Sequence, residues 1–303
     1  MPVPVRYVLS MDTKERSSLV AIVISFAIGL AVAAAGSAGS VDVGSIPLFA
    51  IGAFVAYAIN VIVFVPSYIA KTERYFDLTG SITYLTVTGL AIAFNDQRDT
   101  RAVVIAALVA VWALRLGTFL FIRVTADGGD SRFDVLKTNV WFFLRTWVLQ
   151  GLWVVLTLAC ALAAMTTDDP KPFDLLAGIG LAIWALGFAI EAIADRQKRA
   201  FRADPNNAGR FISTGLWAWS RHPNYFGEIT LWTGIAVMTI PVLSGWRWAM
   251  LISPVFVFLL LTRVSGIPLL ERSGKKRWGG EPAYDEYVAS TPVLLLKPPG
   301  RRS

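Results

Sequence analysis

Long apolar runs, separated by short polar breaks, recur along the chain from Leu19 to Val264. An α-helix needs roughly 17 to 25 apolar residues to cross about 30 Å of hydrocarbon. The pattern predicts eight membrane-spanning helices, at residues 19–36, 46–66, 79–94, 102–124, 140–165, 174–194, 226–243 and 247–264. The third, seventh and eighth runs are short or interrupted, so counts of seven and nine stay open. We therefore expect an all-α polytopic helix bundle.

Composition supports this interpretation. Of the 303 residues, 55% are hydrophobic and only 16% are charged, whereas charged residues make up about a quarter of soluble domains. We expect one integral-membrane domain over residues 1–303, with the N-terminal segment and the first span in residues 1–45.

The basic residues predict the orientation. With an even number of spans and the N-terminus inside, twenty Lys and Arg fall in inner segments and three in outer loops. Basic residues collect on the cytoplasmic side of membrane proteins, so both termini are expected there. The net charge of +7 then belongs to the inner face, where it would meet anionic lipid or an anionic ligand.

Cys160 is the single cysteine and His222 the single histidine. A disulfide framework and the usual cysteine or histidine metal sites are therefore excluded. Chemistry has to come from the polar groups that interrupt the apolar helices.

Two predicted spans carry such groups. Arg115 lies near the middle of the fourth span, where an arginine costs roughly 2.5 to 3.5 kcal/mol; it predicts an anionic partner, with a buried ion pair or a snorkelling side chain as the alternative. Asp77 lies at the inner entrance of the third span, and Tyr84 lies seven residues further on the same helical face. These two side chains can line a polar cavity, unless Asp77 is only a helix N-cap.

The sixth span runs out into a charged segment. Glu191, Asp195, Lys198 and Arg202 are spaced for one face of a helix that continues past the membrane. Arg199 and Arg210 complete a basic cluster. A carboxylate among guanidinium groups suits a ligand that has both hydroxyls and phosphates; a solvated face beneath lipid headgroups is the alternative.

The stretch "SRHPNYFGE" follows at residues 220–228. Pro223 suits the first turn of a helix and favours an extended His222. Asn224, Glu228 and Trp232 then recur every four residues on one face, with Tyr225 beside them. This polar face is expected to point into a site inside the bundle.

The last segment follows Arg263 and contains Glu271, Tyr284 and Tyr287. Its polar pattern and apolar end predict an interfacial helix that folds back beneath the bundle, where it can cap a cofactor. A plain membrane-surface anchor is equally compatible with its composition.

Together, "ADRQK", "GLWAWSRHPNYFGE", "SGIPLLE" and "YDEYVAST" resemble the bacterial membrane proteins called domain of unknown function 1295, within the steroid 5-alpha-reductase superfamily. The resemblance covers roughly residues 50–298, in a steroid-reductase-like region set at 46–298. The motif "RHPxYxG" alone is shared with sterol reductases and isoprenylcysteine carboxyl methyltransferases. A bacterial protein of this kind would lie in the inner (cytoplasmic) membrane.

The resemblance implies an NADPH-dependent reductase of an activated carbon–carbon double bond in a steroid or other lipid. It implies that four residues line the cofactor: Asn224, Tyr225, Glu228 and Trp232. It also implies that Asp195, Arg202 and Arg210 bind the ribose and phosphates of the cofactor. The resemblance further implies that Arg115, Arg132 and Arg263 bind the cofactor. We add Lys198, Arg199 and His222 to the predicted cofactor residues. His222 is expected to orient the cofactor or the loop that carries this histidine.

The catalytic residues transfer less well. Steroid 5-alpha-reductases use a glutamate and a tyrosine on the substrate's oxygen, and the matching positions here hold Asp77 and Trp112, with Tyr84 as another source of a hydroxyl. Two other functions stay open. One is an S-adenosylmethionine-dependent methyltransferase acting on a lipid or prenyl thiol acid, and the other is a lipid-binding protein without catalysis.

Overall fold

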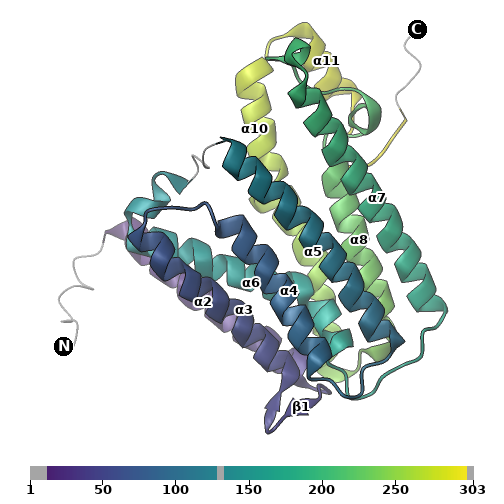
Figure 1. The fold of residues 1–303 in the computed structure, drawn as a ribbon. Coiled ribbons are helices and arrows are strands. Elements are labelled where there is room, and N and C mark those ends of the chain that lie inside the picture. Colours follow the sequence, from purple (N-terminus) through teal and green to yellow (C-terminus); the bar gives the residue numbers. More distant parts are fainter. Residues whose placement is uncertain (1–11, 128–132, 299–303) are drawn as a thin grey trace. The chain divides into compact units, whose positions relative to one another are not determined.

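A computed structural model describes residues 12–127 and 133–298. Within these ranges, eight helices are long and apolar enough to cross a membrane, which confirms the predicted number. Six of them are single α-helices and a seventh is α8 with a 3-10 turn at Ile240–Val242; Figure 1 shows all seven as long rods. They are α2 (Thr13–Ser37), α3 (Leu48–Ile69), α4 (Phe76–Ala93), α5 (Thr100–Asp127), α6 (Val140–Met165), α7 (Leu175–Ala203) and α8 (Pro223–Thr239).

The eighth helical segment changes its winding along its length. It begins as a 3-10 helix at Gly245–Leu251, continues as α9 (Ile252–Leu259), passes through a π-helical turn at Leu260–Val264 and includes α10 (Ile267–Trp278). The short helix α11 (Pro282–Ser290) follows. The predicted polar tail is thus helical, whereas its position at a membrane surface stays a prediction.

The chain forms two compact units. The first runs to Pro172 and also contains Pro241–Ile252; the second consists of Phe173–Ile240 and the chain from Ser253 onward. This division does not test the prediction of one integral-membrane domain.

In the first unit, α6 is the central helix and contacts α2, α3, α4 and α5. Nearly all of it is buried, as expected of a helix that is apolar on every side. At one end lies a short hairpin of β1 (Asp42–Val43) and β2 (Ile46–Pro47). The buried Arg247 guanidinium donates to the carbonyls of Gly39, at 2.8 Å, and Ala163, and to Thr167 Oγ1 at 3.0 Å. These bonds hold the connecting segments together.

In the second unit, glycines bring α7 and α8 into backbone contact. Gly180 and Gly187 on α7 face Gly234 and Gly227 on α8, and a Cβ on any of the four would lie about 2.6 Å or less from the other helix. Because each pair is seven residues apart, each lies on one face of its helix. The close approach places buried Asp195 beside the first turn of α8, where Asn224 Nδ2 donates to Asp195 Oδ1 at 3.3 Å.

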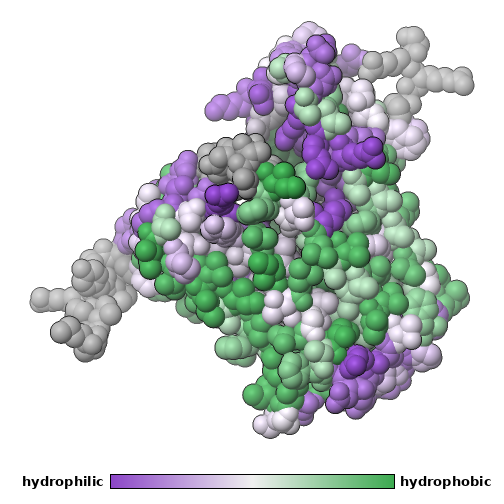
Figure 2. Space-filling model, viewed as in Figure 1, coloured by the Kyte–Doolittle hydropathy of each residue, from purple (hydrophilic) through white to green (hydrophobic). Residues whose placement is uncertain are grey.

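The end of the second unit is polar. α7 continues unbroken to Ala203, as predicted from its charged face, and is followed by two short 3-10 helices at Pro205–Asn207 and Gly215–Ala218. Figure 2 shows hydrophilic side chains over α10, α11 and the adjoining end of α7, while the middle of α7 is mostly hydrophobic. This polar end holds the cavity described next.

Candidate functional site

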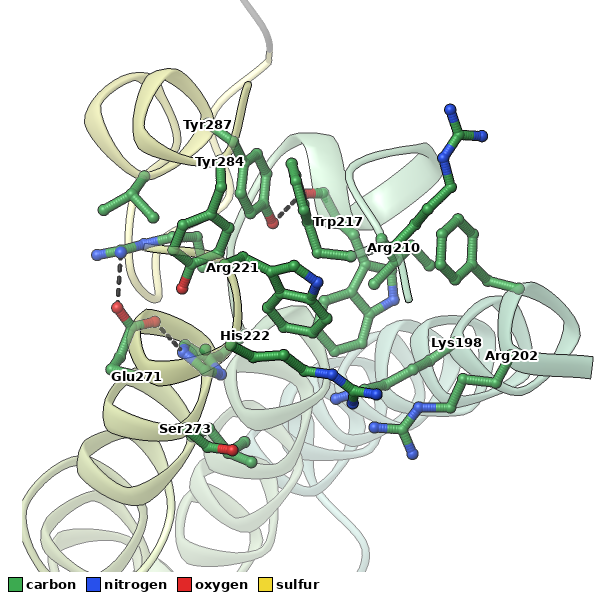
Figure 3. Close-up of a pocket in the computed structure, with 18 residues that line it drawn as sticks. Lys198, Arg202, Arg210, Trp217, Arg221, His222, Glu271, Ser273, Tyr284 and Tyr287 are labelled. Atoms are coloured by element: carbon green, nitrogen blue, oxygen red, sulfur yellow. Dashed lines mark hydrogen bonds and ion pairs between the residues drawn. The ribbon is translucent and has the colours of Figure 1, made fainter. Parts of the chain in front are cut away.

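A cavity of about 180 Å³ opens at the polar end of the second unit. Its walls are the last turns of α7, the loop before α8, and one face each of α10 and α11 (Figure 3). Pockets for drug-sized ligands measure roughly 300–1,000 Å³. The cavity therefore has room for one part of a large cofactor.

Basic side chains line one side of this cavity. Lys198 and Arg202 are one helical turn apart on α7, so both reach the same wall. Arg210 extends from the following loop, and Figure 3 shows the three on the same side of the site. Lys198 Nζ also lies 4.5 Å from the centre of the Trp217 ring. With Arg221 and Arg277, five cations line the cavity against one carboxylate, Glu271.

Aromatic rings form the opposite wall. Phe211 packs against Tyr287 and Tyr284 with ring centres 5.4 Å and 5.1 Å apart, and against Trp278. Tyr287 donates its hydroxyl proton to the Trp217 carbonyl at 2.7 Å. Burial raises the pKa of both tyrosine hydroxyls, so they stay protonated at neutral pH. Phe211 and Tyr287 are stacked, whereas Tyr284 and Trp278 meet Phe211 edge-on. Aromatic rings of this kind suit contact with a planar ring.

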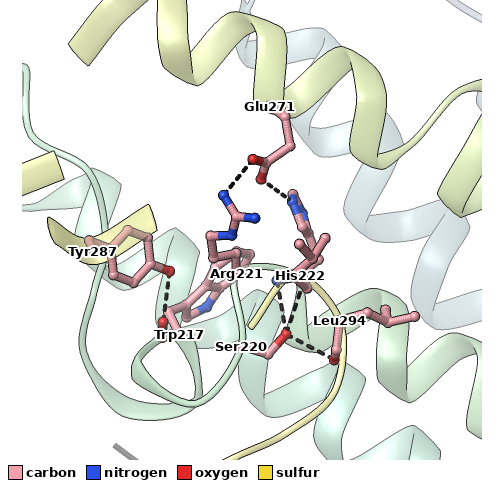
Figure 4. Close-up of polar contacts among 8 residues, drawn as sticks. Trp217, Ser220, Arg221, His222, Glu271, Tyr287 and Leu294 are labelled. Atoms are coloured by element: carbon pink, nitrogen blue, oxygen red, sulfur yellow. Dashed lines mark hydrogen bonds and ion pairs between the residues drawn. The ribbon is translucent and has the colours of Figure 1, made fainter. Parts of the chain in front are cut away.

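A charged cluster joins the loop before α8 to α10. Glu271 accepts from Arg221 Nη1 at 2.6 Å and from His222 Nε2 at 2.8 Å (Figure 4). His222 is only 4% exposed. Its backbone N–H donates to Ser220 Oγ at 3.1 Å, and that hydroxyl in turn donates to the Leu294 carbonyl at 2.9 Å. The segment after α11 thus fixes the backbone of His222 through the Ser220 hydroxyl.

The local sequence explains the position of His222. Pro223 occupies the first turn of α8, as predicted, and His222 precedes it as the N-cap residue with φ −137°. Tyr225, one turn into the helix, stacks on the imidazole with ring centres 5.6 Å apart. The imidazole is therefore held by this stacking contact and by its hydrogen bond to Glu271.

The protonation state of His222 follows from its surroundings. Burial lowers the pKa of His222, the bond to Glu271 offsets only part of this, and the charges of Lys198 and Arg221 lower it further. The imidazole is therefore neutral at pH 7. An ionised carboxylate can only accept hydrogen bonds, so the proton is on Nε2 and Nδ1 carries a lone pair. Nδ1 is buried and has no hydrogen-bond partner among the described residues.

Four predicted cofactor residues line this cavity: Lys198, Arg202, Arg210 and His222. Asp195, Asn224 and Tyr225 lie nearby through the contacts given above but do not line it. Part of the predicted cofactor set thus comes together at one end of the second unit. The binding roles of these residues stay predictions.

The other predicted residues of this unit lie elsewhere. Arg199 and Arg263 are exposed, Glu228 is half-buried, and Trp232 is 1% exposed within the packing of α8. None of the four lines the cavity. Arg132 is outside the described residues.

The predicted catalytic residues belong to the first unit. Tyr84 and Trp112 meet edge to face with ring centres 5.0 Å apart, which links α4 to α5. Arg115 lies half-buried on α5, one turn beyond Trp112. Asp77 is half-buried in the first turn of α4, whose N-cap is Tyr75. The interpretation of Asp77 as the N-cap is therefore wrong, and its catalytic role stays a prediction.

Several cavity residues had not been assigned to the site from the sequence. Arg221, Trp217, Phe211, Arg277 and Trp278 join the cavity walls. One signal was present: Glu271, Gly274 and Trp278 recur at helical spacing on α10 and share one face. The partners of Glu271 are about fifty residues earlier in the chain, and no local pattern reveals that pairing.

Known proteins give a family but few close relatives. The model of the family described as "Protein of unknown function (DUF1295)" matches residues 63–291. An uncharacterized protein of Schizosaccharomyces pombe is 26% identical over 163 residues, which cover 44% of this chain and 46% of that protein. A protein of Ustilaginoidea virens, named "Probable O-methyltransferase", is 29% identical over 140 residues, 39% of this chain and 49% of its own length. The chain spans about half the length of these curated relatives, and no solved structure matches it.

Proposed function

For a chain that belongs to the DUF1295 family of proteins of unknown function, we propose an NADPH-dependent reductase that acts on an activated carbon–carbon double bond of a membrane lipid. The observation that carries this proposal is the cavity of the second unit, with five cations, one carboxylate and an aromatic wall. We infer that the protein works in a bacterial inner membrane, in agreement with its eight apolar helices.

Charge favours a phosphate-bearing cofactor. Guanidinium groups bind phosphate through paired, charge-assisted hydrogen bonds. Glu271 is already bonded to Arg221 and His222, so Lys198, Arg202 and Arg210 give this side of the cavity an excess of positive charge. NADPH carries three phosphate groups, whereas S-adenosylmethionine carries none and has a positive sulfonium. The cavity therefore suits the dinucleotide better.

The size of the cavity favours binding of one end of the dinucleotide. At about 180 Å³, it holds one end of a dinucleotide and leaves the rest outside. In the aromatic wall, the stacked rings of Phe211 and Tyr287 offer a surface for a purine, with Tyr284 edge-on beside them. Because cations also line this cavity, we assign the cavity to the adenosine end of the dinucleotide and its phosphates.

NADPH, when bound, would supply the hydride that the reaction needs. The residues proposed to act on the substrate's oxygen belong to the first unit. Tyr84 offers a hydroxyl and Trp112 an indole N–H, and their rings are in contact. Donors aimed at an oxygen that becomes negative lower the barrier to reduction. Asp77, at the start of the same helix as Tyr84, is the proposed acid.

Thermal stabilisation tests the cofactor directly. A ligand present at 100 times its Kd stabilises a protein by about 2.7 kcal/mol, which raises the Tm measurably. NADPH should raise the Tm of the detergent-purified protein, and S-adenosylmethionine should not. Stabilisation by S-adenosylmethionine alone would overturn the reductase proposal.

A second candidate function is an S-adenosylmethionine-dependent methyltransferase. The relative from Ustilaginoidea virens, named as an O-methyltransferase, favours it. Both cofactors contain adenosine, so the aromatic wall suits either one. The five cations of the cavity are the feature that a sulfonium ligand leaves unexplained.

A further inference from the structure

Two adjacent side chains of the cavity have buried polar atoms with no hydrogen-bond partner among the described residues. One is the acceptor Nδ1 of His222, and the other is the donor Nε of Arg221. Leaving a buried polar group without a partner is unfavourable, and such groups in folded proteins usually find one. Both residues line the cavity, so a ligand that enters against this wall can provide both partners.

The hydrogen bonds of Glu271 determine which atoms of Arg221 and His222 remain without a partner. Its Oε1 accepts from Nε2 of His222, and its Oε2 accepts from Nη1 of Arg221. The carboxylate therefore keeps the imidazole proton on Nε2 and turns Nδ1 into an acceptor. The atoms left without a partner are an acceptor on residue 222 and a donor on residue 221, the preceding residue of the chain.

We propose that Glu271 is a positioning residue that makes the Arg221 and His222 pair specific for adenine. The inference rests on the proposed function, because it takes NADPH as the ligand. Adenine presents an amino donor next to a ring-nitrogen acceptor, the pattern that an asparagine or glutamine amide reads. His222 Nδ1 would accept from the 6-amino group, and Arg221 would donate to the neighbouring ring nitrogen. Hypoxanthine has an oxygen at position 6, which would meet the lone pair of Nδ1 instead.

The carboxamide of nicotinamide offers the same donor and acceptor pattern. The cavity favours adenine, because its cations suit the phosphates of the adenosine end and its volume leaves the remainder outside. A change made only in the purine ring therefore separates the two possibilities.

The test compares the binding of NADPH with that of its hypoxanthine analogue. The wild-type protein should bind NADPH roughly tenfold more tightly or better, the discrimination expected of one good base contact. In Glu271→Gln the amide oxygen stays with Arg221 and the amide N–H faces Nε2, so the imidazole proton moves to Nδ1. This variant should lose the preference for adenine or reverse it. Glu286→Gln, exposed on α11, removes the same charge and should keep the preference.

NMR spectroscopy can determine which imidazole nitrogen of His222 carries the proton. His222 is the only histidine of the chain, so the ¹⁵N NMR shifts of labelled imidazole nitrogens report this residue alone. The wild type should show the Nε2–H form and Glu271→Gln the Nδ1–H form.

The outcomes are distinguishable. Equal wild-type affinity for the two nucleotides, or a wild-type Nδ1–H form, overturns the inference and leaves the reductase proposal intact. Failure of both nucleotides to bind overturns the proposed function as well. The wild-type measurements decide the matter even if Glu271→Gln does not fold.

Discussion

Gly187 on α7 and Gly227 on α8 touch backbone to backbone. A Cβ built on either glycine would lie 2.6 Å from the carbonyl oxygen of the other. This contact fixes the distance between the helices that carry Asp195 and Asn224, and with them the turn that bears His222.

A methyl group at this contact should therefore destabilise the second unit. Overpacking of a close contact costs about 1–3 kcal/mol, so Gly187→Ala should lower the Tm by several degrees, as measured by thermal unfolding in detergent. Gly178→Ala is the matched control on the same helix, because nothing lies within 4 Å of a Cβ there. It should leave the Tm unchanged or raise it. Equal effects of the two substitutions would contradict the role of the contact.

Arg202 and Arg199 distinguish the cavity from the rest of the basic surface. Both side chains are exposed, but Arg202 lines the cavity and Arg199, three residues earlier on α7, does not. Losing a charge-assisted hydrogen bond costs about 1.5–3 kcal/mol, so Arg202→Ala should weaken NADPH binding by roughly tenfold or more. Arg199→Ala should change it little. Fluorescence titration with NADPH measures both, and a larger loss in Arg199→Ala would move the phosphate site elsewhere.

His222 should make the protein less stable in acid. Burial lowers the pKa of His222 below its unfolded value of about 6.5. The unfolded state then binds the proton more readily, so the stability contribution is complete above pH 6.5 and is lost as the pH falls toward the folded pKa. Thermal unfolding between pH 5 and pH 8 should show this loss in the wild type.

His222→Gln is the control for that pH dependence, because glutamine does not titrate and the chain has no other histidine. The variant should lack the part of the pH dependence just below pH 6.5. A wild-type curve that runs parallel to that of the variant would show that His222 keeps its ordinary pKa.

Tyr84 should matter for turnover and not for cofactor binding. Removing one hydrogen-bond donor to a developing oxyanion costs about 10²–10³ in kcat, so Tyr84→Phe should lower the rate of NADPH consumption with an enone lipid by a similar factor. Its NADPH affinity should match that of the wild type. Tyr75→Phe is the control, since Tyr75 is 46% exposed at the start of the same helix. Full activity in Tyr84→Phe would remove this residue from the proposed chemistry.

The sequence alone predicted the number of spanning helices, because the free energy of crossing hydrocarbon depends on the length and polarity of each segment by itself. Local rules also predicted the continuation of α7 through its charged face and the start of α8 at Pro223. Each of these features is decided within a few turns of chain. The same local reasoning placed Lys198, Arg202, Arg210 and His222 near one another, and they line one cavity.

The tertiary structure decided which distant groups meet. Glu271 bonds to Arg221 and His222 from about fifty residues away, and the glycines of α7 and α8 meet across the loop that carries Arg210. Hydrophobic patterning predicts that a helix face is buried, but it does not predict which side chains of other helices contact that face. The proton on Nε2 of His222, and with it the acceptor at Nδ1, follows from a carboxylate whose position only the packing of α10 provides.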